Sequence, residues 1–293
     1  MVLIGELANI MAPISICVSI GIIWAISKTD FDTKLITSLI YNVGGPCLIL
    51  ATFHKVQLSN SALTEIALAT LSCYLFFTIF SMVSLLLFRQ DLPSYLPSLI
   101  FPLTGSMGLP VCYFAYGDAG LALALVYFTF GAIGTFTIGA AIAEGKFAPK
   151  HLFRSPFIYA VLLAIALQNT NTQLPIWIFN SLDLLGQMVI PAQLVALGVS
   201  LLQLKGPTFK KSAFLAAFRI LLGIAVGYGV AEIFDLNGAL RAVVILQSAM
   251  PVAVSNYLFA AKFGRRPEEV AGMVIVSTLI SFFSLPILLI FVL

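Results

Sequence analysis

The chain has 293 residues, of which 60% are apolar and 9% are charged, with a formal net charge of +3. This composition excludes a soluble globular domain and is typical of a protein with several membrane spans. The basic residues lie between apolar runs, so the positive charge gives no reason to expect a nucleic-acid partner. The four cysteines lie inside apolar segments and no cysteine–histidine cluster has metal-ligand spacing, so we expect no disulfide framework, metal or cofactor.

A membrane-spanning helix needs about 20 mostly apolar residues. We count ten such runs, and the sixth is so short that its true start could lie nearer His151. In chain order the predicted spans are Leu3–Ile26, Leu35–Phe53, Ile66–Phe88, Tyr95–Tyr116, Gly120–Ala143, Phe157–Leu167, Pro175–Leu202, Ser212–Ile233, Ala239–Ala261 and Val270–Leu293.

Lysine and arginine are concentrated in the connections that follow odd-numbered spans. The connections after even-numbered spans hold only Lys55 and Arg241. Because lysine and arginine stay in the cytoplasm, we expect both termini on the outside. The odd-numbered connections hold Lys28, Lys34, Arg89, Lys146, Lys150, Arg154, Lys205, Lys210, Lys211, Lys262, Arg265 and Arg266.

Ten spans divide into two halves of five, residues 1–147 and 148–293. An odd number of spans in each half forces the second half to insert upside down relative to the first. We therefore predict an all-α membrane protein of ten transmembrane helices, built as two inverted five-helix repeats.

Two predicted spans are interrupted near their middles, at residues 101–110 and 247–256. Proline removes a backbone donor and breaks or bends a helix. In lipid, freed backbone groups are tolerated only where they face protein or a water-filled cavity. Two interruptions at matching places in two halves point to the substrate site of a transporter, where the broken helices cross. The alternative is a pair of ordinary proline kinks, which are common in membrane helices.

The candidate substrate site consists of small and polar residues at these interruptions, where half-helix N-termini suit an anion such as a carboxylate. Tyr41, Asn42 and Gln193 could line the opposite wall of a cavity or simply pack between helices. The residues at the interruptions are Thr104, Gly105, Ser106, Gly108, Pro110, Gln247, Pro251, Ser255 and Asn256.

Ion coupling has two candidate residues, Gln247 and Asp183. Asp183 either lies at the outer interface or, if it is buried, could carry a proton, because burial raises the pKa of a carboxyl group. The basic Arg219 is expected to extend its long side chain to the lipid headgroups. His54 and His151 flank spans and are expected at the interface.

The interrupted stretch 101–110, with residues 116–120 after it, resembles the fourth-span signature of the auxin efflux carrier family. Residues 191–193 resemble its seventh span, and residues 247–264 and 277–281 resemble its last two spans. The resemblance implies the architecture of the bile acid–sodium symporters. Spans one, two, six and seven would form a scaffold, and spans three to five and eight to ten would form a core holding the crossed helices.

One position departs from the family pattern. The family usually has Asn where this chain has Leu103, and in the auxin exporters that Asn helps to hold the substrate carboxylate. The resemblance therefore leaves Thr104, Ser106 and backbone amides on that side, which argues against auxin itself as the substrate. The chain also lacks the long cytoplasmic loop of many plant members, which fits a bacterial inner-membrane protein.

We therefore expect a secondary active transporter that moves a small organic acid by elevator-like alternating access. Alternatives are a sodium-coupled symporter of an amphipathic or other small organic substrate and a membrane sensor that binds ligand without transport. The coupling ion, proton or sodium, stays open. An enzyme is not expected, because no nucleophile–base pair, paired carboxylates or metal cluster lies at membrane depth. The expected partners are a small-molecule substrate, the lipid bilayer and a second copy bound through the scaffold helices.

Overall fold

The computed structural model describes residues 2–28, 30–56, 58–145, 156–170, 172–204 and 210–293. These residues are almost entirely helical, and the extended structure among them is an isolated antiparallel bridge between Pro102 and Val252. The elements are α1 (Val2–Ile26), α2 (Thr33–Leu39), η1 (Ile40–Gly44), α3 (Gly45–Lys55), α4 (Asn60–Leu87), α5 (Leu92–Ile100), η2 (Thr104–Gly108), α6 (Leu109–Gly134), η3 (Thr135–Gly139), α7 (Ala140–Glu144), α8 (Pro156–Asn169), α9 (Ile176–Gln187), α10 (Val189–Gln203), α11 (Lys210–Ile233), α12 (Gly238–Ser248), α13 (Val254–Phe263) and α14 (Pro267–Val292), where η marks a π-helical segment.

Within the described residues, seven helical stretches are long and apolar enough to cross a membrane, and α8 and α12 are shorter apolar helices. The chain is therefore an integral membrane protein with several candidate spans. The seven stretches are Gly5–Ile26, Leu35–Lys55, Asn60–Leu87, Thr104–Glu144, Ile176–Gln203, Lys210–Ile233 and Pro267–Val292.

Each of the ten predicted apolar runs contains helix, although some boundaries differ. The third predicted run begins at Ile66, whereas α4 already begins at Asn60. The earlier start has a local cause, because the Ser59 hydroxyl accepts a hydrogen bond from the Ala62 N–H at 3.2 Å and caps the helix.

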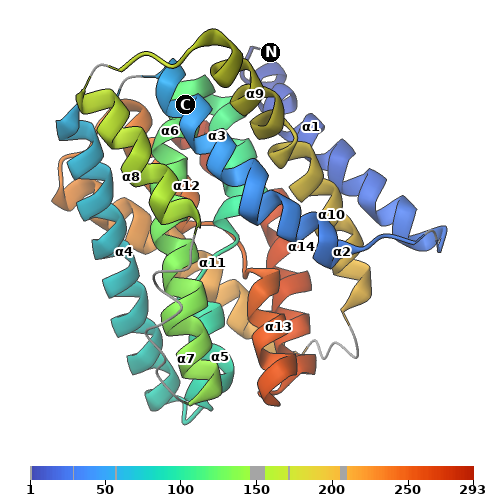
Figure 1. Cartoon of the computed structure of the whole chain (residues 1–293). Coiled ribbons are helices and arrows are strands. Elements are labelled where there is room, and N and C mark those ends of the chain that lie inside the picture. Colours follow the sequence, from blue (N-terminus) through green and yellow to red (C-terminus); the bar gives the residue numbers. More distant parts are fainter. Residues whose placement is uncertain (1, 29, 57, 146–155, 171, 205–209) are drawn as a thin grey trace.

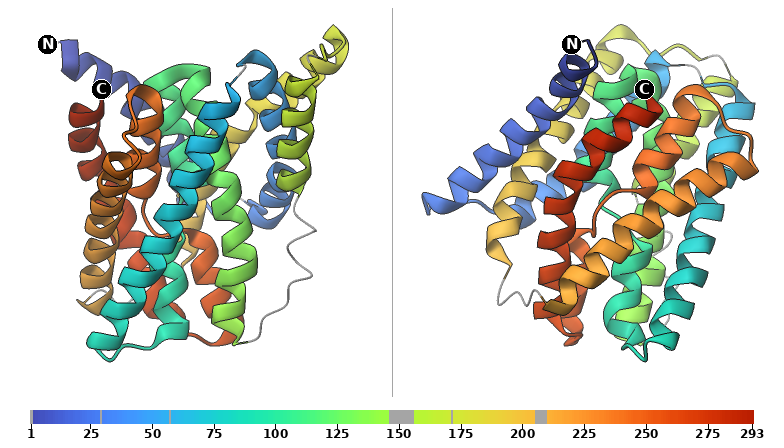
Figure 2. Two further views of the ribbon diagram at one scale, coloured as in Figure 1. Left: turned by 90° about the vertical axis from the view of Figure 1, so that its left-hand side faces the viewer. Right: turned by 180° about the vertical axis from the view of Figure 1, so that it is seen from behind.

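The helices form one bundle in which α4 runs along one side and α1 packs with α10 on the other (Figure 1). Both ends of the chain lie at the same end of this bundle, the upper end in Figure 2. The contact between α1 and α10 is very close: a Cβ atom at Gly21 would lie 2.1 Å from the Val195 carbonyl oxygen. A Cβ atom at Gly198 would likewise lie 2.1 Å from the Val18 carbonyl oxygen, so glycine allows the two backbones to touch.

The long stretch Thr104–Glu144 reverses direction at Gly117, whose φ of 62° and ψ of −152° are not helical. The reversal is tight, because a Cβ atom at Gly120 would lie 2.4 Å from the Cys112 carbonyl oxygen. Glycine fits position 117 because it adopts positive φ without a steric penalty. The stretch therefore passes twice through the bundle.

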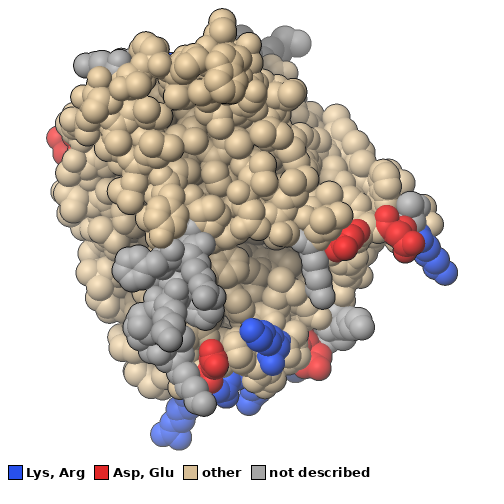
Figure 3. Space-filling view, viewed as in Figure 1, with Lys and Arg blue, Asp and Glu red and all other residues tan. Residues whose placement is uncertain are grey.

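On the face drawn in Figure 3, charged residues gather toward the lower end and the right-hand edge, and the upper part is almost free of them. In Figure 1 the connections from α4 to α5 and from α13 to α14 lie at this lower end. Some of the basic residues behind the predicted charge bias lie outside the described residues, namely Lys146, Lys150, Arg154 and Lys205. The side chain of Lys34 is not described either. His151, which we expect at the interface, also lies outside the described residues.

Candidate functional site

Two helices are interrupted inside the bundle. The helix α5 ends at Ile100, residues 101–103 are not helical, and the chain becomes helical again at Thr104. The helix α12 ends at Ser248, and α13 begins at Val254. Figure 2 shows the two non-helical links as thin ribbon among the surrounding helices.

The prolines do not contribute equally to these interruptions. Pro251 lies within the second one, as the sequence predicts. In the first, the chain leaves the helix around Pro102, whereas Pro110 lies in the first turn of α6. The helical stretch already begins with η2 at Thr104, so Pro110 lies inside it, directly after the π-helical turn. Of the prolines in the predicted interruption 101–110, Pro102 therefore lies in the non-helical link and Pro110 lies in helix.

The two interruptions meet. The Leu103 N–H donates to the Pro251 carbonyl oxygen at 2.7 Å, beside the bridge between Pro102 and Val252. All four residues are buried. Backbone groups that the broken helices cannot satisfy are thus paired with each other, as burial requires.

We call the place where residues 101–103 meet residues 249–253 the crossing. Side chains satisfy two further backbone groups there. The Asn256 side-chain amide donates to the Phe101 carbonyl oxygen at 3.0 Å, which links the start of α13 to the end of α5. The Val252 N–H donates to the Ser277 hydroxyl of α14, also at 3.0 Å. Asn256 therefore has a structural role at the crossing, and its Oδ1 atom is buried without a hydrogen-bond partner among the described residues.

Gln247 lies against the other interrupted helix. Its side chain is fully buried, and neither amide atom has a hydrogen-bond partner among the described residues. A Cβ atom at Gly108 would lie only 2.2 Å from the Gln247 Oε1 atom, so the absence of a side chain at Gly108 makes room for this amide. A buried amide without a partner is costly, and in a membrane protein such a group marks a candidate binding site.

Gly105 lies close to α10 in the same region. A Cβ atom at Gly105 would lie 2.8 Å from the Phe128 ring and 3.4 Å from the Gln193 Oε1 atom. Gln193 belongs to α10, and its Oε1 atom is also buried without a described partner. The structure thus places Gln193 beside Gly105 of the first interrupted segment.

The other candidate residues at the interruptions differ in exposure. Thr104 and Pro110 are buried, whereas Ser106 and Ser255 are half-buried. The half-buried hydroxyls are therefore the more accessible polar groups of the two interrupted segments. Leu103, at the position where the resemblance leads us to expect Asn, is 7% exposed and offers only its backbone.

Tyr41 and Asn42 separate in the structure. The centres of the Tyr41 and Phe157 rings are 4.9 Å apart. The centre of the Phe157 ring is in turn 5.1 Å from that of Phe128, the ring beside Gly105. Tyr41 is thus connected to the crossing through two aromatic rings. Asn42 is exposed, and its amide donates to the Ser38 carbonyl oxygen at 2.9 Å, one turn earlier in the chain.

Asp183 is engaged away from the crossing, on α9. One carboxylate oxygen lies 2.7 Å from the Lys55 ammonium group, and the other accepts a hydrogen bond from Gln187 at 2.8 Å. The Asp183 side chain is 24% exposed and paired, so it is not an isolated buried carboxyl group.

Arg219 of α11 lies elsewhere than we expected from the sequence, which favoured a side chain extended to the lipid headgroups. Its side chain does not reach the headgroups, because it is 0% exposed. It donates from Nη2 to the Ser248 carbonyl oxygen at 3.1 Å, at the end of α12. The signal in the sequence was the spacing of Arg219, Gly223 and Gly227, which places a long charged residue and two small ones on one face of a helix.

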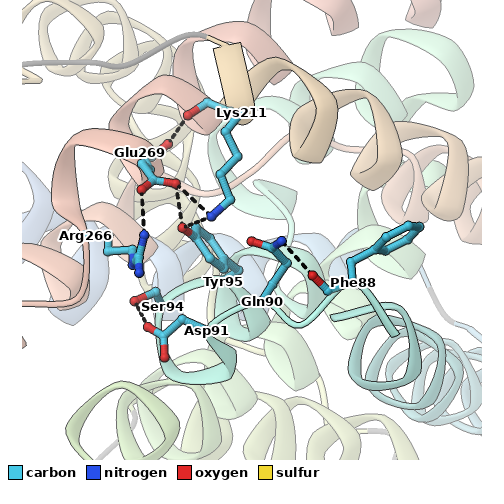
Figure 4. Close-up of polar contacts among 9 residues, drawn as sticks. Phe88, Gln90, Asp91, Ser94, Tyr95, Lys211, Arg266 and Glu269 are labelled. Carbon is cyan, nitrogen blue, oxygen red and sulfur yellow. Dashed lines mark hydrogen bonds and ion pairs between the residues drawn. The ribbon is translucent and has the colours of Figure 1, made fainter. Parts of the chain in front are cut away.

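A second polar cluster fixes the far end of α5 (Figure 4). The Tyr95 hydroxyl donates to Glu269 Oε2 at 2.5 Å, and the Lys211 ammonium group lies 3.3 Å from the same oxygen. Arg266 contacts the other Glu269 oxygen at 3.1 Å. This cluster joins α5, α11 and α14, and no local pattern predicts it because its members come from three distant segments.

Cys17, Cys47, Cys73 and Cys112 are free, and no group of three or more metal-ligating side chains occurs within the described ranges. What the crossing offers is a set of buried amides, backbone groups and helix ends. Such groups can bind and orient a small molecule.

The sequence of the chain also matches a known protein family and several relatives. Residues 141–289, just over half of the chain, match the family described as "Membrane transport protein". The chain is 28% identical over 151 residues to auxin efflux carrier component 1 of Arabidopsis thaliana, a match that covers 48% of this chain and 24% of the plant protein.

Two archaeal proteins are similar over more of the chain. An uncharacterized transporter of Methanothermobacter thermautotrophicus is 22% identical over 269 residues, covering 87% of this chain and 88% of that protein. An uncharacterized transporter of Methanocaldococcus jannaschii is 25% identical over 191 residues, and the match covers 61% of each chain.

Proposed function

Because the chain belongs to the auxin efflux carrier family of membrane transport proteins, we propose that this membrane transporter moves a small organic acid by alternating access. The family is non-enzymatic, so binding and movement are what the site must achieve. The single observation that carries the proposal is the hydrogen bond between Leu103 and Pro251, which joins two interrupted helices inside the bundle. Broken helices that converge inside a membrane protein are the usual substrate site of secondary transporters.

We propose ten spans in two inverted repeats, residues 1–147 and 148–293. The boundary between these halves falls within residues 146–155, outside the described residues. Three features support this arrangement: helical structure in all ten apolar runs, one interruption in each half, and the reversal at Gly117 that divides Thr104–Glu144 between two spans. The location of both chain ends at one end of the bundle also fits an even number of spans (Figure 2).

The proposed orientation has both termini outside the cytoplasm, in a bacterial inner membrane. Its support is the position of the charged residues toward the end of the bundle opposite the termini (Figure 3). Lysine and arginine near span ends favour the cytoplasmic side. A cysteine introduced at the exposed Lys262 would react with an impermeant thiol reagent only after the membrane is opened.

The substrate class follows from the charges that helix ends provide. The first residues of η2 and of α13 follow the interruptions, and N-terminal N–H groups carry partial positive charge. A carboxylate suits such a site. The plant relative is named an auxin efflux carrier component, which supports an organic acid in general, while the apolar side chain of Leu103 argues for a different acid.

For the moving parts, we propose that α1, α2–α3, α8 and α9–α10 form a scaffold and that the remaining helices form a core that carries the substrate. The close glycine contacts between α1 and α10 support a rigid scaffold. Gln193 of α10 would then lie at the sliding surface opposite Gly105. We also propose a homodimer through the scaffold, which light scattering of the purified protein would test.

The experiment is a thermal-shift screen of mono- and dicarboxylates, with and without sodium, followed by counterflow in proteoliposomes. A ligand that binds the folded state raises the unfolding temperature by mass action. We expect a carboxylate that stabilises the protein and exchanges across the bilayer, and a sodium requirement would identify a symporter. Binding without counterflow would replace the transport proposal with a membrane sensor.

A further inference from the structure

Arg219 occupies an unusual position behind the crossing. Its guanidinium carbon lies 4.5 Å from the centre of the Phe77 ring, and its Nη2 atom donates to Ser248, the last residue of α12. A Cβ atom at Gly223 would lie 2.3 Å from the Ser248 carbonyl oxygen and 2.9 Å from Arg219 Nη1. Glycine at that position therefore lets α11 and α12 approach closely enough for the contact to form.

The charge of this guanidinium is not neutralised by an acid. Among the described residues, Arg219 has no ion pair, and its Nε and Nη1 atoms have no hydrogen-bond partner. The polar groups nearby are neutral: the Ser248 hydroxyl lies 2.9 Å from the Tyr127 hydroxyl and donates to Cys73. A buried charge without a counter-charge is costly, so its presence calls for a compensating interaction.

Part of that compensation comes from α12 itself. The C-terminal end of a helix carries partial negative charge on its free carbonyl groups, which favours a cation there. No acidic side chain among the described residues supplies the rest, and the residues next to Ser248 lead directly into the crossing. Gln247, directly before Ser248, lies against Gly108. Pro251, three residues after Ser248, accepts the hydrogen bond from the Leu103 N–H.

We propose that Arg219 is a positioning and specificity-determining residue. Its guanidinium holds the end of α12 in place and provides the fixed positive charge that makes the crossing prefer a carboxylate over a neutral ligand. It acts through Ser248 and Gln247 rather than by direct contact with the substrate. This inference rests on the proposed function as an organic-acid transporter.

The test compares acids with their neutral amides, which have nearly the same shape. The probes are three pairs: acetate and acetamide, benzoate and benzamide, and indole-3-acetate and indole-3-acetamide. Dissociation constants come from thermal-shift titrations of purified wild-type protein, Arg219→Gln and Arg219→Lys. Arg241→Gln serves as the control, because Arg241 is paired with Glu232 near the surface.

We expect wild-type protein to prefer the acid of at least one pair. Arg219→Gln should reduce that preference by about ten-fold or more, since a unit charge acts strongly across a low-dielectric interior. Arg219→Lys keeps the charge and should retain most of the preference, and Arg241→Gln should leave it unchanged. If Arg219→Gln does not fold, Arg219→Met replaces the charge with an apolar side chain suited to a buried site.

The outcomes separate the two proposals. Equal weakening of acid and amide by Arg219→Gln would mean that Arg219 is only structural and would overturn this inference alone. Equal binding of acid and amide by the wild-type protein would overturn it without any variant. If none of the three acids binds but the wider screen finds an acid that does, that acid and its amide become the probe pair. Failure of the wild-type protein to bind any acid in the wider screen would overturn the organic-acid proposal and this inference with it.

Discussion

The N–H of Leu103 and the carbonyl oxygen of Pro251 form a 2.7 Å hydrogen bond that connects two interrupted helices far apart in the sequence. Each group would be without a partner if its own segment stood alone in lipid, where unsatisfied backbone groups are costly. The interruptions therefore stabilise each other. This mutual dependence makes the crossing sensitive to any change that restores helix in one segment.

Replacing Pro251 with Ala removes the residue that opposes helix formation in the second interruption. Proline disfavours the helix interior by about 3 kcal/mol, which corresponds to a factor of about 100 in an equilibrium constant. We expect Pro251→Ala to lose at least about ten-fold in ligand affinity, measured by thermal-shift titration, while its far-ultraviolet circular dichroism stays helical. Pro286→Ala, inside the continuous helix α14, is the matched control. Unchanged affinity in Pro251→Ala would contradict a role for the interruption.

Gly108 and Gln247 should show energetic coupling. A methyl group at Gly108 would lie 2.2 Å from Gln247 Oε1, so Gly108→Ala should lower stability by about 1–3 kcal/mol through overpacking. Gln247→Ala removes the obstructing amide, and the double variant should recover much of that loss. A double-mutant cycle of unfolding temperatures measures the coupling. If the changes in unfolding temperature of the two single variants simply add, the two residues do not interact.

Asn256 supports the crossing through one hydrogen bond. Asn256→Ala leaves the Phe101 carbonyl oxygen buried without its partner, and we expect a loss of about 1–3 kcal/mol in stability. The neighbouring Ser255→Ala changes a half-buried hydroxyl and should alter the unfolding temperature little. Comparing the two in the same detergent checks the prediction. Equal effects of both substitutions would argue against the assigned role of Asn256.

The glycine contacts between α1 and α10 predict opposite outcomes for two similar substitutions. Gly198→Ala places a Cβ atom 2.1 Å from the Val18 carbonyl oxygen and should cost about 1–3 kcal/mol. Gly229→Ala, in α11, has open space around the new methyl group and should stabilise by up to about 1 kcal/mol through helix propensity. Thermal unfolding of the two variants should therefore shift in opposite directions.

Glu269 joins three helices at the far end of α5. Glu269→Gln removes the charge that Lys211 and Arg266 contact, and we expect a modest loss of about 1 kcal/mol because these groups are partly exposed. High salt screens ion pairs, so the difference from wild type should shrink at 1 M salt. Glu268→Gln, an exposed neighbour, should be neutral. A salt-independent difference would point to the Tyr95 hydrogen bond instead.

Much of the helical structure was predictable from apolar runs alone. A chain in lipid must satisfy its backbone within each segment, so a run of about 20 apolar residues is nearly always a helix. Boundaries were less predictable, because capping by Ser59 and the reversal at Gly117 depend on single residues. The interruption around Pro251 was also visible, since proline acts locally on its own helix.

The sequence by itself determined that this chain is helical, lies in a membrane and is interrupted at two places. Only the tertiary structure decided that Pro102 rather than Pro110 marks the first interruption, that Gln247 lies against Gly108, and that Arg219 is buried at the end of α12. The physical reason is how far apart along the chain the interacting groups are. Helix formation depends on neighbours a few residues away, whereas the position of a buried amide or guanidinium depends on which distant backbone groups and glycines meet it.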